Sequence, residues 1–459
     1  MERYDIIVIG SGPGGYVAAI RAAQCGKRVA IVEKADAGGV CLNWGCIPTK
    51  ALVRSTQVFA DCKAAAAFGV DIEGEVKPNW TKMVERERMV ATTMNKGVQF
   101  LLKKNNIDVI AGFGRLKAAD TVEVEGVDYE ADHIILATGA RPRVMPFMPI
   151  DGKHIISSKE ALVLPELPES MVVVGSGAIG SEFAYIYATM GVKVTIVEYM
   201  PQIMPLEDED TAKAMERAFR KLRATVMTST TVKQVTVRED GKCDVEIEGK
   251  KGVQRLEADI VLSAVGIKSN IEDMGLEELG VEIERDKIKV DEHFKTSVDG
   301  VYAIGDIVAT PALAHVASAE AIHCVEHICG LSPEPIDYST IPSCIFTSPE
   351  VASVGMTEAQ VKAQGIEYKV GKFPYTASGK ATAAGERDGF VKLIFDAEEK
   401  LLGAHFVGHN VTEMIGEPTL AKVLGVNAHR IARTIHAHPS MHEAVMEAAE
   451  DALGCAIHM

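Results

Sequence analysis

The chain has 459 residues, of which 47% are hydrophobic and 24% are charged, and its formal net charge is −16. This acidic balance argues against nucleic-acid phosphates or anionic membrane surfaces as partners. The length predicts about three domains, and the nine cysteines, an odd number at low density, indicate a reducing compartment. No basic N-terminal segment with a cleavage site and no long apolar run is present, so we expect a cytoplasmic protein.

The first elements predict a dinucleotide-binding unit. A buried strand over residues 5–9 leads into the run Gly10-Ser11-Gly12-Pro13-Gly14-Gly15, then into an alanine-rich helix and a second strand that ends at Glu33. Glycines at this turn let the backbone approach a pyrophosphate, the helix N-terminus favours its charge, and Glu33 can accept hydrogen bonds from ribose hydroxyls. The alternative is a tight glycine turn without a ligand, but the strand-turn-helix context favours a nucleotide.

Two cysteines follow shortly after this unit, Cys41 and Cys46, with Gly45 just before the second. A metal site favours a C-x2-C pair with further ligands downstream, which this run lacks. Five steps of regular helix rise about 7.5 Å, more than the roughly 7 Å that a disulfide bridges. A disulfide therefore requires the backbone to leave the helix, and Gly45 makes that departure cheap. We interpret the pair as redox-active; the alternative is two buried structural thiols.

The middle of the chain repeats the dinucleotide pattern. Residues 51–110 are predicted to be mainly helical and residues 122–135 to form a β-meander, after which several prolines indicate a crossing between domains. A strand over 171–174 then leads into a second glycine run, Gly175 to Gly180, and the following helix and strand end at Glu198. Two such units imply two dinucleotides. A carboxylate at Glu198 binds a ribose 2′-hydroxyl and repels a 2′-phosphate, which favours NAD over NADP for the second unit.

Two later motifs carry further candidate site residues. A strand ending at Gly305-Asp306 places an acid where it can hold a polyhydroxyl chain, although the same acid can serve as a helix N-cap. The remaining segment, from about residue 341, is predicted to be an α+β unit.

Near its end, Pro439 suits the first position of a helix, with His438 just outside it and Glu443 one turn further in. A histidine oriented by a carboxylate is a general base; a metal site or a structural role is the alternative.

On these motifs the chain resembles the FAD-dependent pyridine nucleotide-disulfide oxidoreductases over nearly its whole length. The motifs are Gly39-Val40-Cys41 through Lys50, Ala137-Thr138-Gly139, Gly175 through Gly180 with Glu182, Gly305-Asp306, the run 346–350, and His438-Pro439 with Glu443. The resemblance implies an α/β fold with two Rossmann-like domains and a C-terminal α+β dimerisation domain. The implied domains are FAD-binding over 1–149, NAD-binding over 150–270, central over 271–340 and dimerisation over 341–459.

The resemblance also implies cofactors, partners and site residues. Cys41, Cys46, His438 and Glu443 are expected to be catalytic, with His438 and Glu443 reaching the cysteines of the other subunit of a homodimer. The expected FAD site comprises Gly10, Gly12, Gly15, Glu33, Lys50, Gly114, Thr138, Gly139, Ala140, Asp306, Ala312, Leu313, Ala314 and His315. The expected NAD site comprises Gly175, Gly177, Ile179, Gly180, Glu182, Glu198, Val232 and Gly266. Lys50 is expected to pair with Glu182, and no metal is expected.

Within the family, the motifs are most similar to those of members that oxidise dihydrolipoyl groups presented by a carrier protein of a multienzyme complex. Reduced substrate would attack Cys41, and Cys46 would pass electrons to FAD and then to NAD. The alternatives are a related NADH-dependent disulfide reductase with another substrate and a non-catalytic flavoprotein that only docks into a complex.

Overall fold

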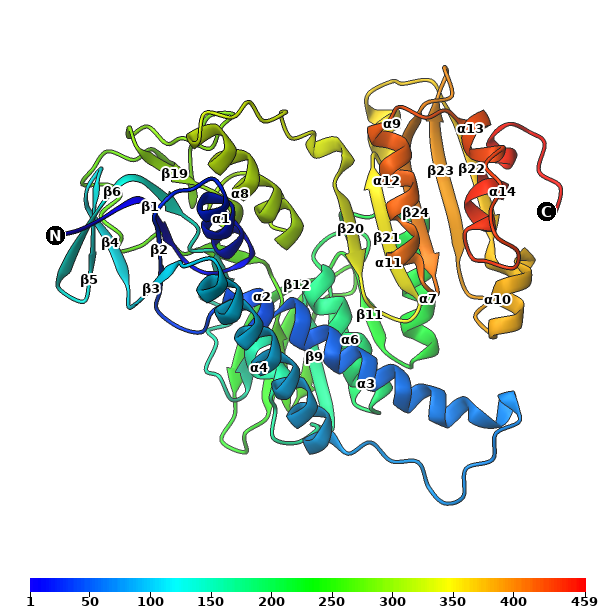
Figure 1. Cartoon of the computed structure of the whole chain (residues 1–459). Coiled ribbons are helices and arrows are strands. Elements are labelled where there is room, and N and C mark those ends of the chain that lie inside the picture. Colours follow the sequence, from blue (N-terminus) through cyan, green and yellow to red (C-terminus); the bar gives the residue numbers. More distant parts are fainter. The chain divides into compact units, whose positions relative to one another are not determined.

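The computed structural model describes residues 1–459, which divide into two compact units (Figure 1). The first unit comprises residues 1–52, 81–143 and 266–336, and the second comprises residues 53–80, 144–265 and 337–459. Every helix falls short of the combined length and hydropathy that a bilayer-spanning segment needs.

The first unit is built on a sheet whose central strand, β1 (Glu2–Ile9), pairs in parallel with a strand on each side. In spatial order the strands are β3 (Asp108–Ala111), β2 (Val29–Glu33), β1, β6 (Val127–Leu136), β5 (Thr121–Val124) and β4 (Gly114–Ala118), with β19 (Val301–Ala303) also paired to β6. Strands β4, β5 and β6 are antiparallel neighbours, so the predicted meander is confirmed.

Alternation along β1 assigns its side chains to two different cores. Ile6 and Val8 pack with helices on one face of the sheet, whereas Ile7 and Ile9 pack on the other face with Leu116. This separation follows from the two-residue period of a strand. The helices of the first face are α1 (Pro13–Gln24), α4 (Trp80–Lys104) and α8 (Ala314–Ile328). Helices α1 and α8 lie side by side there (Figure 1).

The second unit contains a parallel sheet that repeats the β1–α1–β2 arrangement. Strand β9 (Ser170–Val174) leads into α6 (Ala178–Thr189), and α6 leads into β10 (Lys193–Val197), which pairs in parallel with β9. The sheet continues with β11 (Thr225–Met227) beyond β10, and with β15 (Ile260–Ser263) and β8 (Ile155–Ile156) beyond β9. An antiparallel sheet follows, formed by β12 (Thr231–Val237), β13 (Cys243–Gly249) and β14 (Gly252–Ala258).

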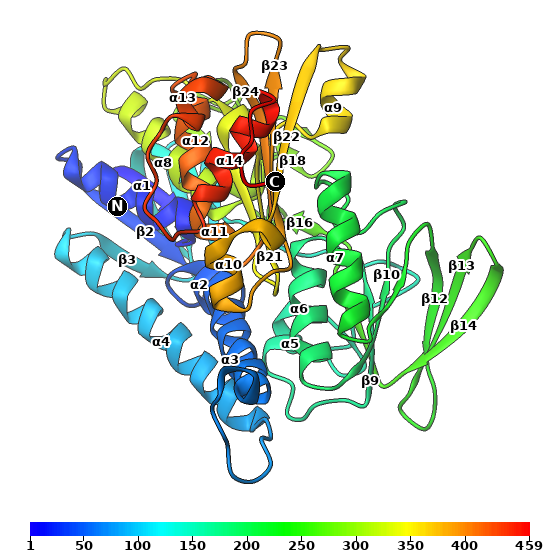
Figure 2. The ribbon, with the colours of Figure 1, turned by 90° about the vertical axis from the view of Figure 1, so that its right-hand side faces the viewer.

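The C-terminal part of the second unit is a five-stranded antiparallel sheet with helices, as the α+β prediction requires (Figure 2). In spatial order its strands are β20 (Pro342–Ile345), β21 (Glu350–Gly355), β24 (Leu401–Gly408), β23 (Phe390–Asp396) and β22 (Tyr368–Pro374). The helices are α9 (Glu358–Ala363), α10 (Gly379–Ala384), α11 (Val411–Met414), α12 (Gly416–Val423), α13 (Ala428–Ala432) and α14 (Glu443–Ala452). Apolar residues of α14, among them Val445 and Ala448, complete the core of this sheet.

A buried ion cluster joins α7 to the C-terminal sheet inside the second unit. Lys392 of β23 is only 2% exposed, and its Nζ lies 2.8 Å from Asp208 Oδ1, 3.1 Å from Asp210 Oδ2 and 2.7 Å from Glu358 Oε2. Asp208 is the N-cap of α7 (Glu209–Lys221). Burial lowers the pKa of Lys392, but the three carboxylates outweigh this effect and hold the pKa above its ordinary value. The ammonium therefore stays charged and fixes α7 against the C-terminal sheet.

Replacement of this lysine should destabilise the second unit strongly. In Lys392→Met the buried Asp208 loses its cation, and breaking a buried ion pair in this way costs about 3–5 kcal/mol. We expect a clearly lower midpoint of urea unfolding, measured by far-UV circular dichroism. Lys400→Met is the matched control, because Lys400 pairs with Glu398 on the surface and exposed pairs contribute only about 0–1 kcal/mol. Equal midpoints for the two variants would contradict the assigned role.

Candidate active site

The two cysteines of the predicted redox pair lie on either side of a helix break. Cys41 belongs to α2 (Gly39–Asn43), and Cys46 is the first residue of α3 (Cys46–Ala64). Between them Trp44 has φ −143° and ψ 16°, far from helical values, so the predicted departure from a regular helix is confirmed. Gly45 contributes by its small size rather than by a left-handed backbone, because a Cβ there would lie 3.0 Å from the Val40 carbonyl oxygen.

The break brings the two sulfur atoms into contact. Cys41 is half-buried and Cys46 is exposed. The hydrogen bond to the Cys46 side chain, burial and the charge of Cys46 raise the pKa of Cys41 well above its ordinary value, although Lys50 and the Cys46 N–H act in the opposite direction. Cys41 therefore keeps its proton in the dithiol form.

Asn43 of α2 and Glu87 and Arg88 of α4 hold the helix break in place, and no sequence motif indicated them. The Asn43 amide donates to the carbonyls of Ala37 and Gly39, 2.9 Å away in each case. Arg88 donates to the Asn43 carbonyl at 2.7 Å, and its guanidinium lies 4.1 Å from the centroid of the Trp44 ring, a cation–π contact. The buried Glu87 carboxylate pairs with Arg88 and fixes its orientation.

The first glycine run has the geometry of a phosphate cradle. Gly10 has φ +101°, and a Cβ there would lie 2.4 Å from the Ala137 carbonyl oxygen; a Cβ on Gly15 would lie 1.8 Å from the Gly10 oxygen. These two glycines therefore allow the turn and the close packing of α1 against β1. At Gly12, the N-cap of α1, no atom lies within 4 Å of a Cβ position, which leaves the approach to the helix N-terminus open to a phosphate.

The second glycine run has nearly the same close contacts and N-cap dihedral angles as the first. A Cβ on Gly175 would lie 2.4 Å from the Ala264 oxygen, one on Gly180 would lie 2.0 Å from the Gly175 oxygen, and Gly177 again faces open space. The N-cap glycines of the two helices have nearly equal dihedrals, φ −63° and ψ −178° at Gly12 against φ −64° and ψ −172° at Gly177. Both turns therefore fit a dinucleotide pyrophosphate.

The predicted ribose-binding acids are also placed alike in the two units. Glu33 Oε2 accepts hydrogen bonds from Ser11 N at 2.9 Å and from Ser11 Oγ at 2.6 Å. Glu198 Oε2 accepts the equivalent bonds from Ser176, at 2.8 Å and 2.6 Å. The serine inside each glycine run thus anchors the acid at the end of the second strand, a role that the sequence analysis did not assign. Neither acid has a basic neighbour in these contacts.

Three residues expected for FAD, Thr138, Gly139 and Ala140, lie in the first unit where two short strands pair. β7 (Ala140–Pro142) pairs with β16 (Ile267–Ser269), and Thr138 Oγ1 donates to the Asn270 carbonyl at 2.6 Å. Asn270 returns a bond to the Thr138 carbonyl at 3.0 Å, and its N–H donates to Gly139 O at 2.9 Å. Asn270 therefore fixes the Ala137-Thr138-Gly139 turn, although it lies far away in sequence. Gly114, at the start of β4, is buried against Ile9.

Asp306 lies at the start of the short 3-10 helix that follows β19. It does not cap α8, whose N-cap is Leu313, so the alternative of a helix cap is wrong. Burial raises the pKa of Asp306, and Lys287, which donates to the Asp306 backbone carbonyl, lowers it less. The buried Glu320 of α8 accepts the Gly305 N–H at 2.7 Å and fixes this turn. A desolvated carboxylate on a fixed turn suits the binding of hydroxyl groups. The expected run from Ala312 to His315 forms the start of α8.

The other residues expected for NAD are divided between the two units. Ile179 is 42% exposed on the first turn of α6, and Val232 is buried on β12. Glu182 is buried on α6 and accepts the Phe346 N–H at 3.0 Å. Gly266 belongs to the first unit, where its carbonyl accepts the Arg143 N–H at 3.0 Å. Lys50 also belongs to the first unit, and its pairing with Glu182 stays a prediction.

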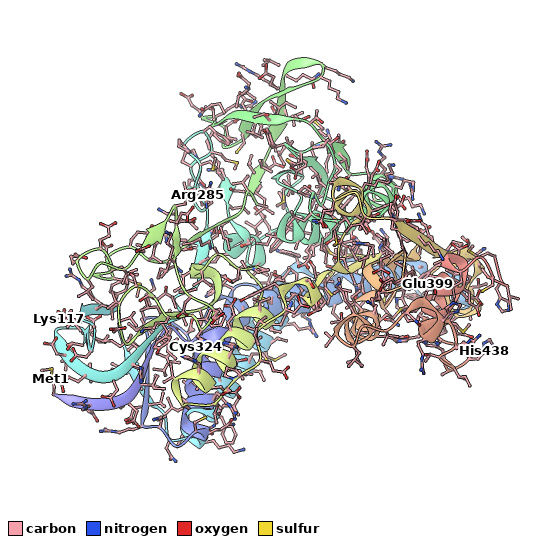
Figure 3. The ribbon with its side chains drawn as sticks, turned by 90° about the horizontal axis from the view of Figure 1, so that it is seen from above. Met1, Lys117, Arg285, Cys324, Glu399 and His438 are labelled. Carbon is pink, nitrogen blue, oxygen red and sulfur yellow. The ribbon has the colours of Figure 1, made fainter.

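His438 and Glu443 form a hydrogen-bonded pair, 2.8 Å apart from Nδ1 to Oε1. Burial raises the pKa of Glu443, but the Ser440 N–H and His438 lower it by more, so the carboxylate is ionised. Such a carboxylate only accepts, which makes His438 Nδ1 the donor; in the neutral imidazole Nε2 is then the nitrogen that carries the lone pair. The His438 side chain is 79% exposed (Figure 3). The arrangement is that of a general base.

The local helix prediction for this segment is wrong. Pro439 does not open a helix: α14 begins at Glu443, with His442 as its N-cap, and the His438–Pro439 peptide bond is cis. Glu443 meets His438 because the loop between them folds back, with Ser440 N–H donating to Glu443 Oε2 at 2.8 Å. The predicted pairing of His438 with Glu443 is therefore correct, but the helix from Pro439 on which that prediction was based does not form.

Glu417 accepts a hydrogen bond from each of the other two histidines of this segment, His436 and His442. Its Oε1 lies 2.7 Å from His436 Nε2, and its Oε2 lies 2.7 Å from His442 Nδ1. His436 Nδ1 also contacts the Thr434 carbonyl at 2.9 Å, so both of its nitrogens face groups that only accept hydrogen bonds. His436 is therefore an imidazolium. Glu417 raises the pKa of His436 by more than burial lowers it. The Glu417–His436 ion pair and the Glu417–His442 hydrogen bond stabilise the loop that carries His438.

Comparison with known proteins agrees with this geometry. The family described as "Pyridine nucleotide-disulphide oxidoreductase" matches residues 4–321, and its dimerisation domain matches residues 341–449. The chain is 47% identical to a dihydrolipoyl dehydrogenase of Chlorobaculum parvum, covering 98% of this chain and 97% of that one, and 43% identical to one of Bacillus subtilis, covering 99% of both. The crystal structure of LpdA from Mycobacterium tuberculosis matches with a TM-score of 0.90 at 27% identity, covering 98% of this chain and 99% of that one. The chain belongs to the pyridine nucleotide-disulphide oxidoreductase family and carries that family's dimerisation domain.

Proposed function

We propose that this protein is a dihydrolipoyl dehydrogenase, which oxidises the dithiol of a dihydrolipoyl group to a disulfide and passes the electrons through Cys41 and Cys46 to FAD and then to NAD. The observation that carries the proposal is the contact of the two cysteine thiols across a helix break, in the same compact unit as the first dinucleotide cradle. Relatives named dihydrolipoyl dehydrogenase that are 43–48% identical over nearly the whole chain support this choice of substrate.

The chain's own residues perform the thiol chemistry. His438, oriented by Glu443, takes the proton from one substrate thiol, and the resulting thiolate attacks the Cys41 sulfur of the oxidised Cys41–Cys46 pair. A mixed disulfide forms, the Cys41–Cys46 bond breaks, and Cys46 leaves as a thiolate. The second substrate thiol then attacks the substrate sulfur of the mixed disulfide, its proton passing to Cys41 as Cys41 departs. The raised pKa of Cys41 favours its departure as a thiol.

The residues present fit both cofactors. The first cradle, with Glu33, the Thr138 to Ala140 turn and Asp306, would hold FAD; the second cradle, with Glu198, would hold NAD. When bound, these groups supply two-electron oxidation of the dithiol and hydride acceptance. Glu198 already receives Ser176 N–H and Oγ–H on one oxygen and the Met200 N–H on the other. This fixed negative charge would repel the 2′-phosphate of NADP.

A second copy of the chain would complete the site. Beside the loop of His438, the large apolar side chains of Leu420, Val423 and Leu424 on and after α12 are at least 59% exposed, and Ile435 is 97% exposed. Apolar groups left in water at this density mark a protein interface. In a homodimer His438 would serve the cysteines of the other subunit. The substrate would come on a lipoyl-bearing carrier protein of a multienzyme complex.

An anaerobic spectral titration tests the function directly. Dihydrolipoamide added to the FAD-loaded enzyme should reduce the cysteine pair and produce a long-wavelength charge-transfer band, and steady-state turnover should strongly prefer NAD over NADP. Cys41→Ser, the control, should show no band with dihydrolipoamide. If NADH produces the band but dihydrolipoamide does not, the enzyme is a disulfide reductase for another substrate. If no reductant changes the flavin spectrum, the protein is a non-catalytic flavoprotein.

Removal of the base should reduce turnover without unfolding the protein. His438 is largely exposed, so His438→Gln removes proton transfer and little packing. We expect kcat/KM for dihydrolipoamide to fall by about 10²–10⁴-fold, the usual contribution of a general base. The matched control is His429→Gln on α13, an exposed histidine that pairs with Glu399. Equal losses of activity in the two variants would contradict the assignment.

The Glu417–His436 pair should make the C-terminal loop stable only over a window of pH. The pKa of His436 is raised above 6.5 in the folded protein, so its contribution is complete below pH 6.5 and is lost as pH rises through the raised value. The pKa of Glu417 is lowered below 4.5, despite burial, by His436 and His442, so its contribution is complete above pH 4.5 and is lost as pH falls through the lowered value.

We therefore expect the difference in melting temperature between the wild-type protein and Glu417→Gln to be largest between pH 4.5 and 6.5. Differential scanning fluorimetry across pH measures this difference. Glu413→Gln, a substitution of a carboxylate on the neighbouring α11, serves as the control. A difference that does not change with pH would refute the ionic origin of this stabilisation.

A further inference from the structure

Two cysteines outside the redox pair lie next to each other in the first unit. Cys25 is the C-cap of α1, and Cys329 is the C-cap of α8. The two thiols lie close enough that an interaction with Cys25 raises the pKa of Cys329, and both residues are half-buried. They are separated by most of the chain, so this proximity results from the packing of the two helices and has no counterpart in a local sequence motif.

The packing of α1 against α8 fixes this proximity along the whole length of the helices (Figures 1 and 2). Near their N-terminal ends, a Cβ on Gly14 would lie 3.3 Å from the Ala317 carbonyl oxygen, so the backbones are in close contact. One turn before the cysteines, Arg21 Nε donates to Glu326 Oε1 at 3.0 Å. The pairs Gly14–Ala317, Arg21–Glu326 and Cys25–Cys329 have nearly the same difference in residue number, as two parallel helices packed in register require. The first two contacts therefore hold the C-terminal ends of the helices together.

The surroundings distinguish the two thiols chemically. Burial, the hydrogen bond that Cys329 donates to Cys25 and the charge of Cys25 raise the pKa of Cys329 to about 11, and Lys27 and Arg21 lower it less. Cys329 therefore keeps its proton while Cys25 reacts. The charge of Cys25 no longer raises the pKa of Cys329 once Cys25 has been oxidised to a neutral group, so Cys329 becomes easier to deprotonate when it is needed as a nucleophile.

We propose that Cys25 and Cys329 are a second redox-responsive pair, which hydrogen peroxide converts into a disulfide joining the ends of α1 and α8. The Cys25 thiolate attacks one peroxide oxygen; the S–O bond forms, the O–O bond breaks, and hydroxide leaves and is protonated to water. Cys329 then attacks the sulfenic sulfur; the S–S bond forms, the S–O bond breaks, and the second oxygen leaves as water with the Cys329 proton. The two sulfurs lose two electrons to the peroxide.

The Cys25–Cys329 disulfide would link the two helices whose N-terminal ends border the first cradle. Helix α1 begins at the first glycine run, and α8 begins at the Ala312 to His315 segment and carries Glu320, which fixes the Gly305–Asp306 turn. A covalent link between their C-terminal ends restricts the separation of the two helices. The disulfide should therefore resist opening of the cradle and raise the temperature at which flavin is released.

Peptide mapping of the full-length, FAD-loaded protein tests the proposal. The reduced protein is exposed to graded hydrogen peroxide, remaining thiols are alkylated with iodoacetamide, and the digest is analysed by mass spectrometry without reduction. We expect a peptide pair linked through Cys25 and Cys329, formed within the single chain and reversed by dithiothreitol. Cys455→Ser, which removes an exposed cysteine elsewhere, should leave the link unchanged, and Cys329→Ser should leave Cys25 as a sulfenic acid or a more oxidised form.

The proposal is overturned if Cys25 and Cys329 are both still alkylated at peroxide concentrations that oxidise exposed Cys455, or if Cys25 links to another cysteine. The wild-type mapping decides this even if Cys329→Ser does not fold. As a second readout, flavin fluorescence during heating should give a midpoint several degrees higher for the oxidised than for the reduced protein in Cys455→Ser. That shift should be absent in Cys25→Ser. Neither measurement depends on turnover, so failure here leaves the proposed activity standing.

Discussion

The helix break at Trp44 and Gly45 is the constraint on which the active centre depends. Two sulfurs five positions apart on a continuous helix cannot bond, and here the chain ends one helix after Asn43 and starts another at Cys46. The break is tightly packed at Gly45, where a Cβ would lie 3.0 Å from the Val40 carbonyl oxygen and would force that carbonyl to shift. It also needs further support, because an interrupted helix leaves backbone groups unpaired. Arg88 and Asn43 supply that support.

The same kind of steric constraint, used twice, builds the two cradles. In each of them the last glycine of the run meets the carbonyl of the first at a distance that excludes any Cβ, and a serine within the run anchors the acid at the end of the next strand. Since these contacts are local in sequence, the repeat was visible in the sequence, and both strand-helix-strand units could be predicted. The β-meander and the C-terminal α+β unit were predictable for a similar reason, because strand periodicity is local.

What could not be predicted depends on pairs that are distant in the chain. Asn270 with Thr138 and Lys392 with Asp208 each join residues that no periodicity relates. Pro439 misled the helix prediction because a proline fits the first turn of a helix and also fits a tight loop, and only tertiary contacts decide between the two. The domain boundaries and the pairing of Lys50 with Glu182 stay predictions, since they concern relations between parts of the chain.

Proton handling connects the separate features of the site. Oxidation of a dithiol to a disulfide releases two protons together with two electrons, and each proton needs an acceptor when its sulfur reacts. His438 is a suitable first acceptor, because ionised Glu443 occupies Nδ1 and leaves Nε2 available. Cys41 is a suitable second acceptor, because burial and the contact with Cys46 hold its pKa high. Cys46 is then left as the sulfur without a proton, and it would be the electron donor to a flavin held in the first cradle.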